Sequence, residues 1–446
     1  MFNLTEIATD LNATLTGADI RFTSCSIDTR QLHSGAIYIA LAGENFDGHD
    51  FIQQAQNNGA VAAVISRDIK TDLPTLQVDD TRNALGKIAN LWRQKFDLPI
   101  IAVTGSNGKT TTKEILKSIF TQQSLSVLAT KGNLNNEIGV PLTLFNLNHE
   151  HRYAVVEMGA NHTGEIANLT KISQPTCAVI TQCSPAHLEG FGTVEGVAKA
   201  KGEIFTNLPA DGIAIINNDD EYAKLWHDLA APHKIKTYGL NNADITAIDI
   251  NLRDNSSEFN LQTPIGNIDI MLPLPGTHNI MNALAATVCA LTCDCSLKTI
   301  QQGLLSMQSV AGRLQIIQGK QGITLINDTY NANPASLKAA LQVLNNTSSP
   351  HWLALGDMGE LGDSSVEFHQ QAGQLAKQFG VEKLWTIGNI SNYAADSFGN
   401  ESYHFANHAD LVQAISEQLP SSATLLIKGS RAMQMEKIVK ALQEGN

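Results

Sequence analysis

The stretch TGSNGKTTTKE, residues 104–114, constrains the fold more than any other part of the chain. The apolar run LPIIAV at 98–103 precedes it and predicts a short buried strand, while apolar residues recur behind it at helical spacing. A glycine-containing loop between a strand and a helix N-terminus suits a phosphate, because free backbone N–H groups and the positive end of the helix dipole converge there. We expect Lys109 to reach the outer phosphates of a nucleotide triphosphate and Thr110 to bind Mg²⁺.

The spacing of this loop differs from the general phosphate-loop pattern. Four residues usually separate the two glycines, whereas Gly105 and Gly108 enclose only two, and Val103 stands where the first glycine is expected. The alternative is a glycine turn before a helix that carries a surface lysine. The flanking strand and helix favour a nucleotide. The candidate nucleotide-binding residues of the loop are Thr104, Gly105, Ser106, Asn107, Gly108, Lys109, Thr110 and Thr111.

Composition limits the number of domains and the kinds of partner. A chain of 446 residues is too long for one ordinary core, and about 150 residues per domain suggests three domains. Hydrophobic residues make up 43% and charged residues 16%, which is typical of a globular protein. The net charge of −13 argues against nucleic acid or an anionic membrane surface as the main partner. Anionic ligands must therefore meet local clusters of lysine and arginine.

The sequence shows no membrane or secretory signal. The N-terminus lacks a basic region followed by a sustained apolar core, and the longest apolar stretch, NALAATVCALTC at 282–293, is shorter than the roughly 20 residues that span a bilayer. The six cysteines include no C-x-x-C pair, which fits buried or incidental thiols in a reducing compartment. We expect a cytoplasmic protein without membrane insertion, and a monomer by default.

Alternating strand-like and helix-like segments predict an α/β protein of three domains, at 1–84, 85–312 and 313–446. In the central domain, RYAVVEMG, TCAVITQ and GIAIINNDDE are typical of the buried strands of a parallel sheet. In the last domain, ITLIND, HWLALGD, KLWTIG and ATLLIKG alternate with helices expected at 334–344, 366–379, 410–419 and 433–442.

Two polar residues follow predicted strands of the central domain. Glu157 ends the run YAVVEMG, so its carboxylate should emerge at the carboxyl edge of the sheet, where ligands of open α/β sheets bind. It is a natural Mg²⁺ ligand beside Thr110, although a strand-end glutamate can also simply cap a neighbour. His187 lies just past another strand, in the loop SPAHLEGFG, where a single histidine is usually a surface residue.

Further candidates lie at the domain junction and in the last domain. Arg313 suits a phosphate clamp between domains and Asp328 suits a ribose hydroxyl, but hinge salt bridges are about as common. The turn LGDMGELG at 355–362 could bind a cation or an amine, or be only a turn. A possible second anion site lies between a strand and a helix, at Lys428, Ser430 and Arg431.

Taken together and in this order, several motifs make the sequence resemble the Mur ligases, which build the peptidoglycan stem peptide. Their loop has glycine, two residues and then Gly-Lys-Thr, which explains the unusual spacing of AVTGSNGKTT. The other matching motifs are SIDTRQLHSGAIYIALAGENFDGHDF, GNLNNEIGVPLTL, EMGANHTGEI, AKGEIF, PGTHNIMNALAA, NDTYNANPASLKAAL, LGDMGELG and KGSRAMQMEKI. The resemblance implies a small N-terminal α/β domain that receives a uridine nucleotide, a central phosphate-loop ATPase domain with a parallel sheet, and a Rossmann-like C-terminal α/β domain.

The resemblance also implies roles for single residues. Lys201, in AKGEIF, matches the lysine that the family carbamylates with CO₂, whereas the sequence alone gives it only a solvated helix face. Two Mg²⁺ ions are implied, one held by Thr110 and Glu157 and the other by His187 and Lys201. The implied catalytic residues are Lys109, Glu157, His187 and Lys201. The adenine side of ATP would meet Asn279 and Asn282, and its phosphate and ribose Arg313 and Asp328. The UDP-sugar-peptide substrate would contact Ser26, Asp28, Thr29, Arg30, Asp47, Gly48, His49, Asn135 and Asn136.

The implied activity is the ATP-dependent addition of D-alanyl-D-alanine to UDP-N-acetylmuramoyl-tripeptide through an acyl phosphate. One alternative is the ligase that adds the third residue to the same nucleotide, but its diaminopimelate-type members carry Asp-Asn-Pro-Arg, which this sequence lacks. Folylpolyglutamate synthase lacks the N-terminal uridine-binding unit. From another class, a nucleotide-dependent switch would use the same loop without ligase activity. The sequence leaves open whether the third residue of the tripeptide is diaminopimelate or lysine. It also leaves open which C-terminal groups hold the dipeptide; the turn LGDMGELG and the substrate-binding candidates Lys428, Ser430 and Arg431 could do so.

Overall fold

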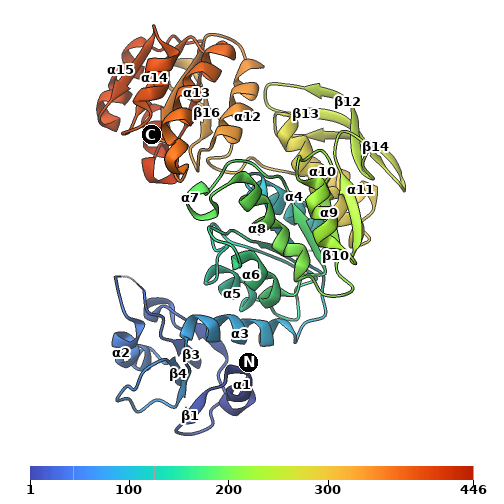
Figure 1. Ribbon diagram of the computed structural model, residues 1–446, viewed down its shortest axis with the longest axis vertical. Coiled ribbons are helices and arrows are strands. Elements are labelled where there is room, and N and C mark those ends of the chain that lie inside the picture. Colours follow the sequence, from blue (N-terminus) through green and yellow to red (C-terminus); the bar gives the residue numbers. More distant parts are fainter. Residues whose placement is uncertain (44, 125, 445–446) are drawn as a thin grey trace.

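The computed structural model describes residues 1–43, 45–124 and 126–444. It contains three α/β units, with the N-terminal and C-terminal units at opposite ends of the long axis and the central unit between them (Figure 1). The α/β class expected from the sequence is confirmed. In the part of the chain that the structure describes, no helix is both long and apolar enough to cross a membrane.

The N-terminal unit is built on a five-stranded sheet. Its strand order is β1 (Thr14–Thr16), β5 (Thr75–Gln77), β4 (Ala62–Ile65), β3 (Ala36–Ile39) and β2 (Ser24–Ser26), parallel except for β1 against β5. The helices are α1 (Leu4–Leu11), α2 (Ile52–Asn57) and α3 (Thr81–Arg93), with short 3₁₀ turns η1 (Thr29–Gln31) and η2 (Gly48–Phe51). The N-terminus of α3 is capped by Asp80, which accepts from the N–H of Arg82 at 2.7 Å.

The helix α3 joins the first unit to the second (Figure 1). Arg93 near its end is buried and donates to three backbone carbonyls, of Ser173 at 2.9 Å, Phe96 at 2.7 Å and Gln174 at 3.1 Å. The expected boundary after residue 84 falls within this helix. The N-terminal and central units are therefore connected by a packed helix rather than by a loose linker.

The central unit contains the parallel sheet that carries the phosphate loop. Its strand order is β11 (Lys234–Tyr238), β10 (Ile213–Asn217), β9 (Cys177–Ile180), β6 (Ile100–Thr104), β8 (Tyr153–Glu157) and β7 (Val127–Ala129). The helices are α4 (Lys109–Gln123), α5 (Gly139–Leu144), α6 (Glu165–Ser173), α7 (Leu188–Phe191), α8 (Val194–Thr206), α9 (Ala223–Ala230), α10 (Thr277–Thr292) and α11 (Leu297–Leu305). One apolar core forms against α4 and α10, and another forms on the opposite face against α6 and α8.

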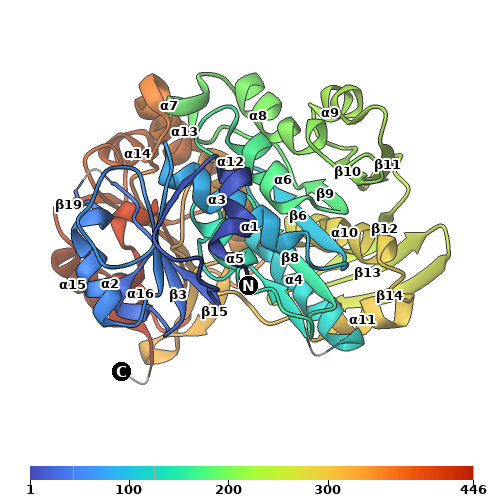
Figure 2. The ribbon, with the colours of Figure 1, turned by 90° about the horizontal axis from the view of Figure 1, so that it is seen from below.

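A three-stranded antiparallel sheet in this unit was not expected from the sequence. It consists of β12 (Thr246–Leu252), β13 (Ser257–Thr263) and β14 (Gly266–Leu272), and it lies beside α10 and α11 (Figures 1 and 2). Phe259, Leu261, Ile270 and Leu272 are buried on one face, so the strands alternate as half-buried strands do.

The C-terminal unit has a six-stranded sheet in the order β15 (Gln315–Gln318), β16 (Thr324–Asp328), β20 (Thr424–Lys428), β17 (His351–Gly356), β18 (Lys383–Ile387) and β19 (Ser402–Phe405). All pairs are parallel except β15 with β16. The helices are α12 (Pro334–Asn345), α13 (Ser365–Gln378), α14 (Asn392–Phe398), α15 (His408–Gln418) and α16 (Glu436–Leu442), with 3₁₀ turns η3 (Lys320–Gly322), η4 (Gly362–Ser364) and η5 (Arg431–Met433). The carboxyl ends of the central strands carry the polar residues considered below.

Candidate active site

The phosphate loop follows β6 and ends where α4 begins at Lys109. Gly105 and Gly108 have φ values of 142° and 83°, which L side chains rarely adopt. A Cβ on Gly105 would lie 1.9 Å from Thr181 Oγ1, and a Cβ on Gly108 would lie 2.3 Å from Asn282 Oδ1. Both glycines are therefore required by backbone conformation and by space, and the loop is a close-fitting cradle.

Lys109 folds back over this loop. Its Nζ donates to the carbonyls of Gly105 at 2.6 Å and Ser106 at 3.4 Å. Burial lowers the pKa of Lys109 to about 8, the charge of Arg313 adds to this lowering, and the carboxylate of Glu157 opposes it. An anion in the cradle would supply the missing negative charge and favour the protonated amine.

Glu157 is a buried carboxylate, 2% exposed, at the end of β8. Its Oε1 accepts from Asn135 Nδ2 at 2.9 Å, and its Oε2 is buried with no hydrogen-bond partner among the described residues. Asn135, which is expected to contact substrate, lines the cavity and orients Glu157 through this hydrogen bond. A buried carboxylate oxygen without a donor is costly unless a cation completes it.

Lys201 on α8 is 1% exposed, with Nζ 3.5 Å from the carbonyl of Ala160 and 5.4 Å from the ring centre of Phe191. Burial lowers the pKa of Lys201 to about 7, and the charge of Lys109 contributes to the same lowering. The solvated helix face that is the default for such a lysine is therefore wrong for Lys201. It describes Lys199 instead, which is exposed and pairs with Glu195 at 2.7 Å.

His187 connects the central unit to the C-terminal unit. It precedes α7 in the left-handed region at φ 53°, and its Nδ1 is paired with the carboxylate of Glu360. The N–H of Leu188 donates to the carbonyl of Glu360 at 3.0 Å. The pairing with His187 lowers the pKa of Glu360, so this carboxylate is ionised at neutral pH.

Arg313 also reaches across the two units. Its Nη2 donates to Thr110 Oγ1 at 3.3 Å, and its guanidinium lies 4.0 Å from the ring centre of Tyr330. In the described part of the chain its buried Nε has no hydrogen-bond partner. The stacked ring holds the cation at the start of α4, next to the phosphate cradle.

Asp328 and Lys428 form a buried ion pair at the carboxyl ends of the adjacent strands β16 and β20. Asp328 Oδ1 accepts from the N–H of Leu314 at 3.2 Å, and Lys428 Nζ also donates to the carbonyl of Asn331 at 3.0 Å. Burial lowers the pKa of Lys428, while Asp328 opposes the change. Lys428 therefore neutralises Asp328 in this structure.

A reciprocal amide pair completes the contact between the two units. Asn333 Nδ2 donates to Asn107 Oδ1 at 2.9 Å, and Asn107 Nδ2 donates to Asn333 Oδ1 at 3.3 Å. Asn333 also caps α12, accepting from the N–H of Ser336 at 2.8 Å. The phosphate loop is thus bonded directly to the first turn of a helix 226 residues away.

These side chains surround one cavity of about 680 Å³ between the central and C-terminal units. Most of the candidate residues line it: Ser106, Asn107, Gly108, Lys109, Thr111, Asn135, Asn136, Glu157, His187, Lys201, Asn279, Asn282, Arg313, Asp328, Lys428 and Arg431. Four other candidates lie close to lining residues in the chain but do not line the cavity themselves, namely Thr104, Gly105, Thr110 and Ser430. The two asparagines of α10 are bonded to each other, Asn282 Nδ2 to Asn279 Oδ1, at 3.2 Å.

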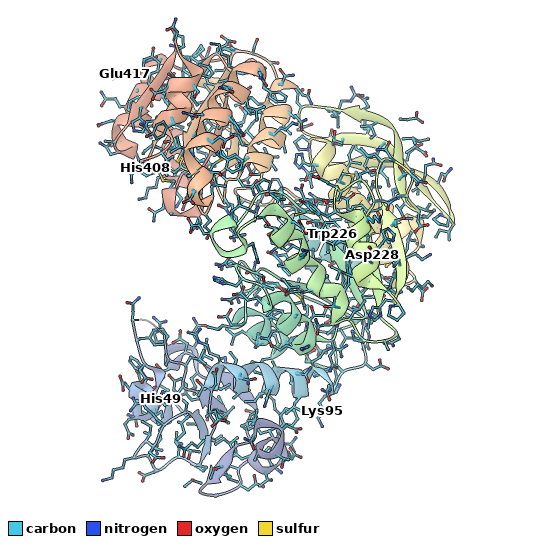
Figure 3. All side chains as sticks on the ribbon, in the orientation of Figure 1. His49, Lys95, Trp226, Asp228, His408 and Glu417 are labelled. Carbon is cyan, nitrogen blue, oxygen red and sulfur yellow. The ribbon has the colours of Figure 1, made fainter. Side chains whose placement is uncertain are left out.

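The seven N-terminal candidates lie apart from this cavity, in the first unit, where Figure 3 labels His49. His49 is buried between Asp47, 2.6 Å from its Nδ1, and the N–H of Ser66, which donates to Nε2 at 2.9 Å. Arg30 pairs with Asp28 at 2.8 Å, and Gly48 donates to the carbonyl of Leu41 at 2.7 Å. These contacts shape the loops after β2 and β3. Ser26 bonds to the carbonyl of Asp28 within the same turn, and Thr29 is buried beside it.

The donor set fits a magnesium nucleotide. Among residues 1–43, 45–124 and 126–444, no three His, Cys, Asp or Glu side chains gather as a preformed metal site. Mg²⁺ needs no such cage, because it keeps several waters and binds through one or two protein groups plus substrate phosphates. The partnerless Oε2 of Glu157 and the hydroxyl of Thr110 are suitable groups at the cradle.

Sequence reasoning missed three residues of the site: Tyr330 beside Arg313, Asn333 bonded to Asn107 of the phosphate loop, and His278 in the cavity wall, where burial lowers the histidine pKa to about 4. Tyr330 and Asn333 stand in the motif NDTYNANP, so their closeness to Asp328 was an available signal. Nothing local indicated which residues of the central unit they would contact.

The fold and the cavity define a nucleotide-dependent enzyme of three α/β domains whose site is shared by the central and C-terminal domains. Family models agree: residues 21–93 match "Mur ligase family, catalytic domain", 103–290 match "Mur ligase middle domain", and 312–431 match "Mur ligase, glutamate ligase domain". The chain belongs to the Mur ligase family.

Individual relatives match over nearly the whole chain. The UDP-N-acetylmuramoyl-tripeptide–D-alanyl-D-alanine ligase of Escherichia coli K12 is 43% identical, over 99% of this chain and 98% of its own. The ligase of the same name from Bacillus subtilis is 34% identical over 94% and 92%. The crystal structure of MurF from Acinetobacter baumannii superposes with a TM-score of 0.93 at 37% identity, covering 98% of both chains. MurF from Thermotoga maritima in complex with ADP gives 0.86 at 26% identity, covering 95% and 98%.

Proposed function

We propose that this chain is an ATP-dependent peptide ligase of peptidoglycan precursor synthesis, which adds D-alanyl-D-alanine to UDP-N-acetylmuramoyl-tripeptide and releases ADP and phosphate. The observation that carries the proposal is the 43% identity to a ligase of that activity over 99% of the chain. The cavity supports it, because a phosphate cradle, four buried or half-buried cations and a carboxylate that could bind a metal converge between two domains.

The chemistry begins with activation of the tripeptide. Its terminal carboxylate is a poor electrophile, so a carboxylate oxygen attacks the γ-phosphorus of ATP, the bond to the β-phosphate oxygen breaks, and an acyl phosphate and ADP form. The amine of the dipeptide then attacks the acyl carbon. The resulting tetrahedral species expels inorganic phosphate and loses a proton, which leaves an amide.

The chain's own groups stabilise the charge that this transfer moves. The backbone N–H groups of the loop and Lys109 would bind the β- and γ-phosphates, and Arg313 would meet the same phosphates from the C-terminal domain. Thr110 and Glu157 would hold one Mg²⁺, and His187 and Lys201 a second. Bound Mg²⁺ supplies charge screening between the anionic carboxylate and the triphosphate.

Lys201 would serve as a metal ligand only after chemical change, and we propose that it is carbamylated. A buried lysine whose pKa is lowered to about 7 is partly neutral at pH 7, so its lone pair can attack CO₂. A C–N bond forms, the nitrogen of the neutral amine releases one proton, and an anionic carbamate results. ¹³C NMR with ¹³CO₂ tests this proposal: a carbamate signal that is present in the wild type and lost in Lys201→Met supports it, and its absence from the wild type contradicts it.

The remaining substrate contacts follow the same proposal. Asn279 and Asn282 would contact the adenine side of ATP, and Asp328 its ribose. Asn136 and Asn135 would lie beside the sugar-peptide. The uridine end would bind the N-terminal domain at Ser26, Asp28, Thr29, Arg30, Asp47, Gly48 and His49.

We further propose that the C-terminal domain closes onto the central domain during turnover and excludes water from the acyl phosphate. Equal compactness in small-angle scattering with and without ATP analogue and UDP-tripeptide would contradict closure.

The deciding experiment is a substrate-omission assay with mass detection of the product. Phosphate release should require both UDP-N-acetylmuramoyl-tripeptide and D-alanyl-D-alanine, with a UDP-pentapeptide as product. Turnover with the UDP-dipeptide and a single amino acid would instead identify a third-residue ligase, and turnover without either acceptor would identify a nucleotide switch. Parallel assays with diaminopimelate and lysine tripeptides identify the third residue. The proposal includes a cytoplasmic monomer without a nucleic-acid partner, which light scattering and purification without bound nucleic acid test.

A further inference from the structure

Two loops of the C-terminal domain lie side by side at the cavity. One follows β17, residues 357–361, and the other follows β20, residues 429–431. The N–H of Ser430 donates to the carbonyl of Asp357 at 2.9 Å, and a Cβ on Gly359 would lie 3.6 Å from the Cβ of Ser430. Glu360 and Arg431 stand one on each loop, and both line the cavity. Groups of opposite charge are thus presented to the cavity from neighbouring turns.

Glu360 is the acid of this region whose charge is not already used within its own domain. Asp328 is neutralised by Lys428. Asp357 accepts from the backbone N–H groups of residues 389, 390 and 391 at 2.8, 3.1 and 2.7 Å, so it fixes the turn. Glu360 sits at φ 61° in the left-handed region and its side chain is 53% exposed, with its partner His187 in the other domain. A strained residue held in a fixed turn at a cavity is a feature of binding sites.

Arg431 is the corresponding cation. Lys428 is 1% exposed and spent on Asp328, whereas the Arg431 side chain is 67% exposed. Within the described residues its one ion pair joins Nη1 to Glu436 at 3.2 Å. A guanidinium has five N–H donors in a planar fork, so the other donors can take a carboxylate through two parallel hydrogen bonds.

We propose that Glu360 binds the ammonium end, and Arg431 the carboxylate end, of the dipeptide acceptor, so that the site recognises the acceptor as a zwitterion. The inference rests on the proposed function and deepens it by naming the two groups that select this substrate. Glu360 and its partner His187 line the same cavity as Lys109, Glu157 and Lys201, so an amine bound at Glu360 lies in the cavity that holds the proposed phosphate and metal groups. Binding of the ammonium would replace the contact with His187.

Steady-state kinetics with Glu360→Gln and Arg431→Gln test the proposal. Loss of a charged hydrogen-bond partner should raise the KM for D-alanyl-D-alanine about 10- to 100-fold in each variant. The KM values for ATP and UDP-tripeptide should stay within about two-fold of the wild type, since neither residue contacts those substrates in this proposal. Glu417→Gln on α15, which Figure 3 labels, and Arg253→Gln in the turn between β12 and β13 are matched controls, because they change the same charges at residues that do not line the cavity.

A modified acceptor separates the two ends of the dipeptide. D-Alanyl-D-alanine amide keeps the amine and lacks the carboxylate. Its KM should therefore be higher than that of D-alanyl-D-alanine for the wild type and for Glu360→Gln, whereas for Arg431→Gln the two KM values should be equal. A general structural role would not produce this selective insensitivity. N-Acetyl-D-alanyl-D-alanine, as an inhibitor, should bind wild type more weakly than the free dipeptide does, and Glu360→Gln should lose that difference.

Each outcome decides between the alternatives. An unchanged dipeptide KM in both variants, with normal wild-type turnover, would overturn the inference. A parallel rise in the KM for ATP would also overturn it and assign Glu360 to domain docking through His187. Absence of pentapeptide from the wild type would instead refute the proposed function. Binding of a non-hydrolysable ATP analogue by both variants shows that they are folded.

Discussion

Replacing Gly108 by alanine should damage the nucleotide cradle by an amount that a second glycine allows to be measured separately. Gly108 precedes α4 with φ 83° and ψ −13°, and Gly164 precedes α6 with φ 90° and ψ −19°. An alanine in this region costs about 1–2 kcal/mol at either position because of the Cβ. At Gly164 nothing lies within 4 Å of the added Cβ, so the backbone term is the whole cost.

At Gly108 the added Cβ would meet Asn282 Oδ1 at 2.3 Å, so the asparagine must move by about 1 Å to restore van der Waals contact. That movement breaks its contact with Thr112 Oγ1 at 3.4 Å and its bond to Asn279 Oδ1 at 3.2 Å. At about 1 kcal/mol for each hydrogen bond, Gly108→Ala should cost about 2 kcal/mol more than Gly164→Ala.

Calorimetric titration with a non-hydrolysable ATP analogue, together with thermal unfolding, measures both parts. Gly164→Ala should lower the unfolding midpoint and leave the affinity unchanged. Gly108→Ala should lower the midpoint further and weaken nucleotide binding by about 10- to 100-fold, because Asn282 and the loop backbone both shift. Equal affinities in the two variants would refute the argument that the cradle depends on the space beside Asn282.

Three further perturbations follow from the contacts. Asn333→Ser keeps a helix cap but removes the amide pair with Asn107. In a double-mutant cycle with Asn107→Ser, the double variant should therefore lose less ATP-analogue binding free energy than the sum of the two single losses; full additivity would show that the pair is not coupled. Burial lowers the pKa of Lys109 to about 8 and of Lys201 to about 7, both below the ordinary lysine value of about 10.4. At a pH between the folded and the unfolded pKa values, unfolding takes up protons, so the ligand-free protein should become more stable as the pH rises from about 7 to 9. Lys201→Met should reduce that rise in the unfolding midpoint, and an unchanged rise would contradict the burial argument. Arg93→Met should leave two buried carbonyls and one partly buried carbonyl without their donor and cost about 2–4 kcal/mol by thermal unfolding, while nucleotide affinity stays the same; a midpoint equal to that of the wild type would show that water replaces the guanidinium.

The sequence predicted those parts of the fold whose signals are local. The apolar run before Thr104, the two glycines and the helical spacing behind them specify a strand, a turn and a helix within about 20 residues. The four C-terminal helices expected from periodicity begin and end close to α12, α13, α15 and α16. The sheet β12–β14 was not predicted, although β13 and β14 alternate as half-buried strands do. In β12 the apolar Ile248 and Ile250 are exposed, so the pattern of that strand does not mark the buried face.

The candidate site was predictable only as separate residues. Glu157 and Arg313 could be placed at a strand end and a domain junction, but their partners Asn135, Thr110 and Tyr330 depend on how the strands and domains are arranged in space. No periodicity relates residues of different domains. The burial of Lys201 could not be predicted from the sequence pattern, because a lysine ordinarily prefers solvent. Only the family resemblance indicated a role for it.

The cations of this site are buried in a protein of net charge −13, and their burial has an electrostatic cost. Burial lowers the pKa of Lys109, Lys201 and Lys428, and Asp328 opposes the change at Lys428 through a close ion pair. Among the described residues, the other two lysines have no comparable ion pair, so their burial has an electrostatic cost that a bound anion would offset. A triphosphate beside Lys109 and a carbamate on Lys201 would each supply negative charge at these positions. Groups that destabilise the ligand-free chain are therefore the ones that favour the occupied state, because a ligand that relieves an electrostatic cost of the folded protein gains that free energy in binding.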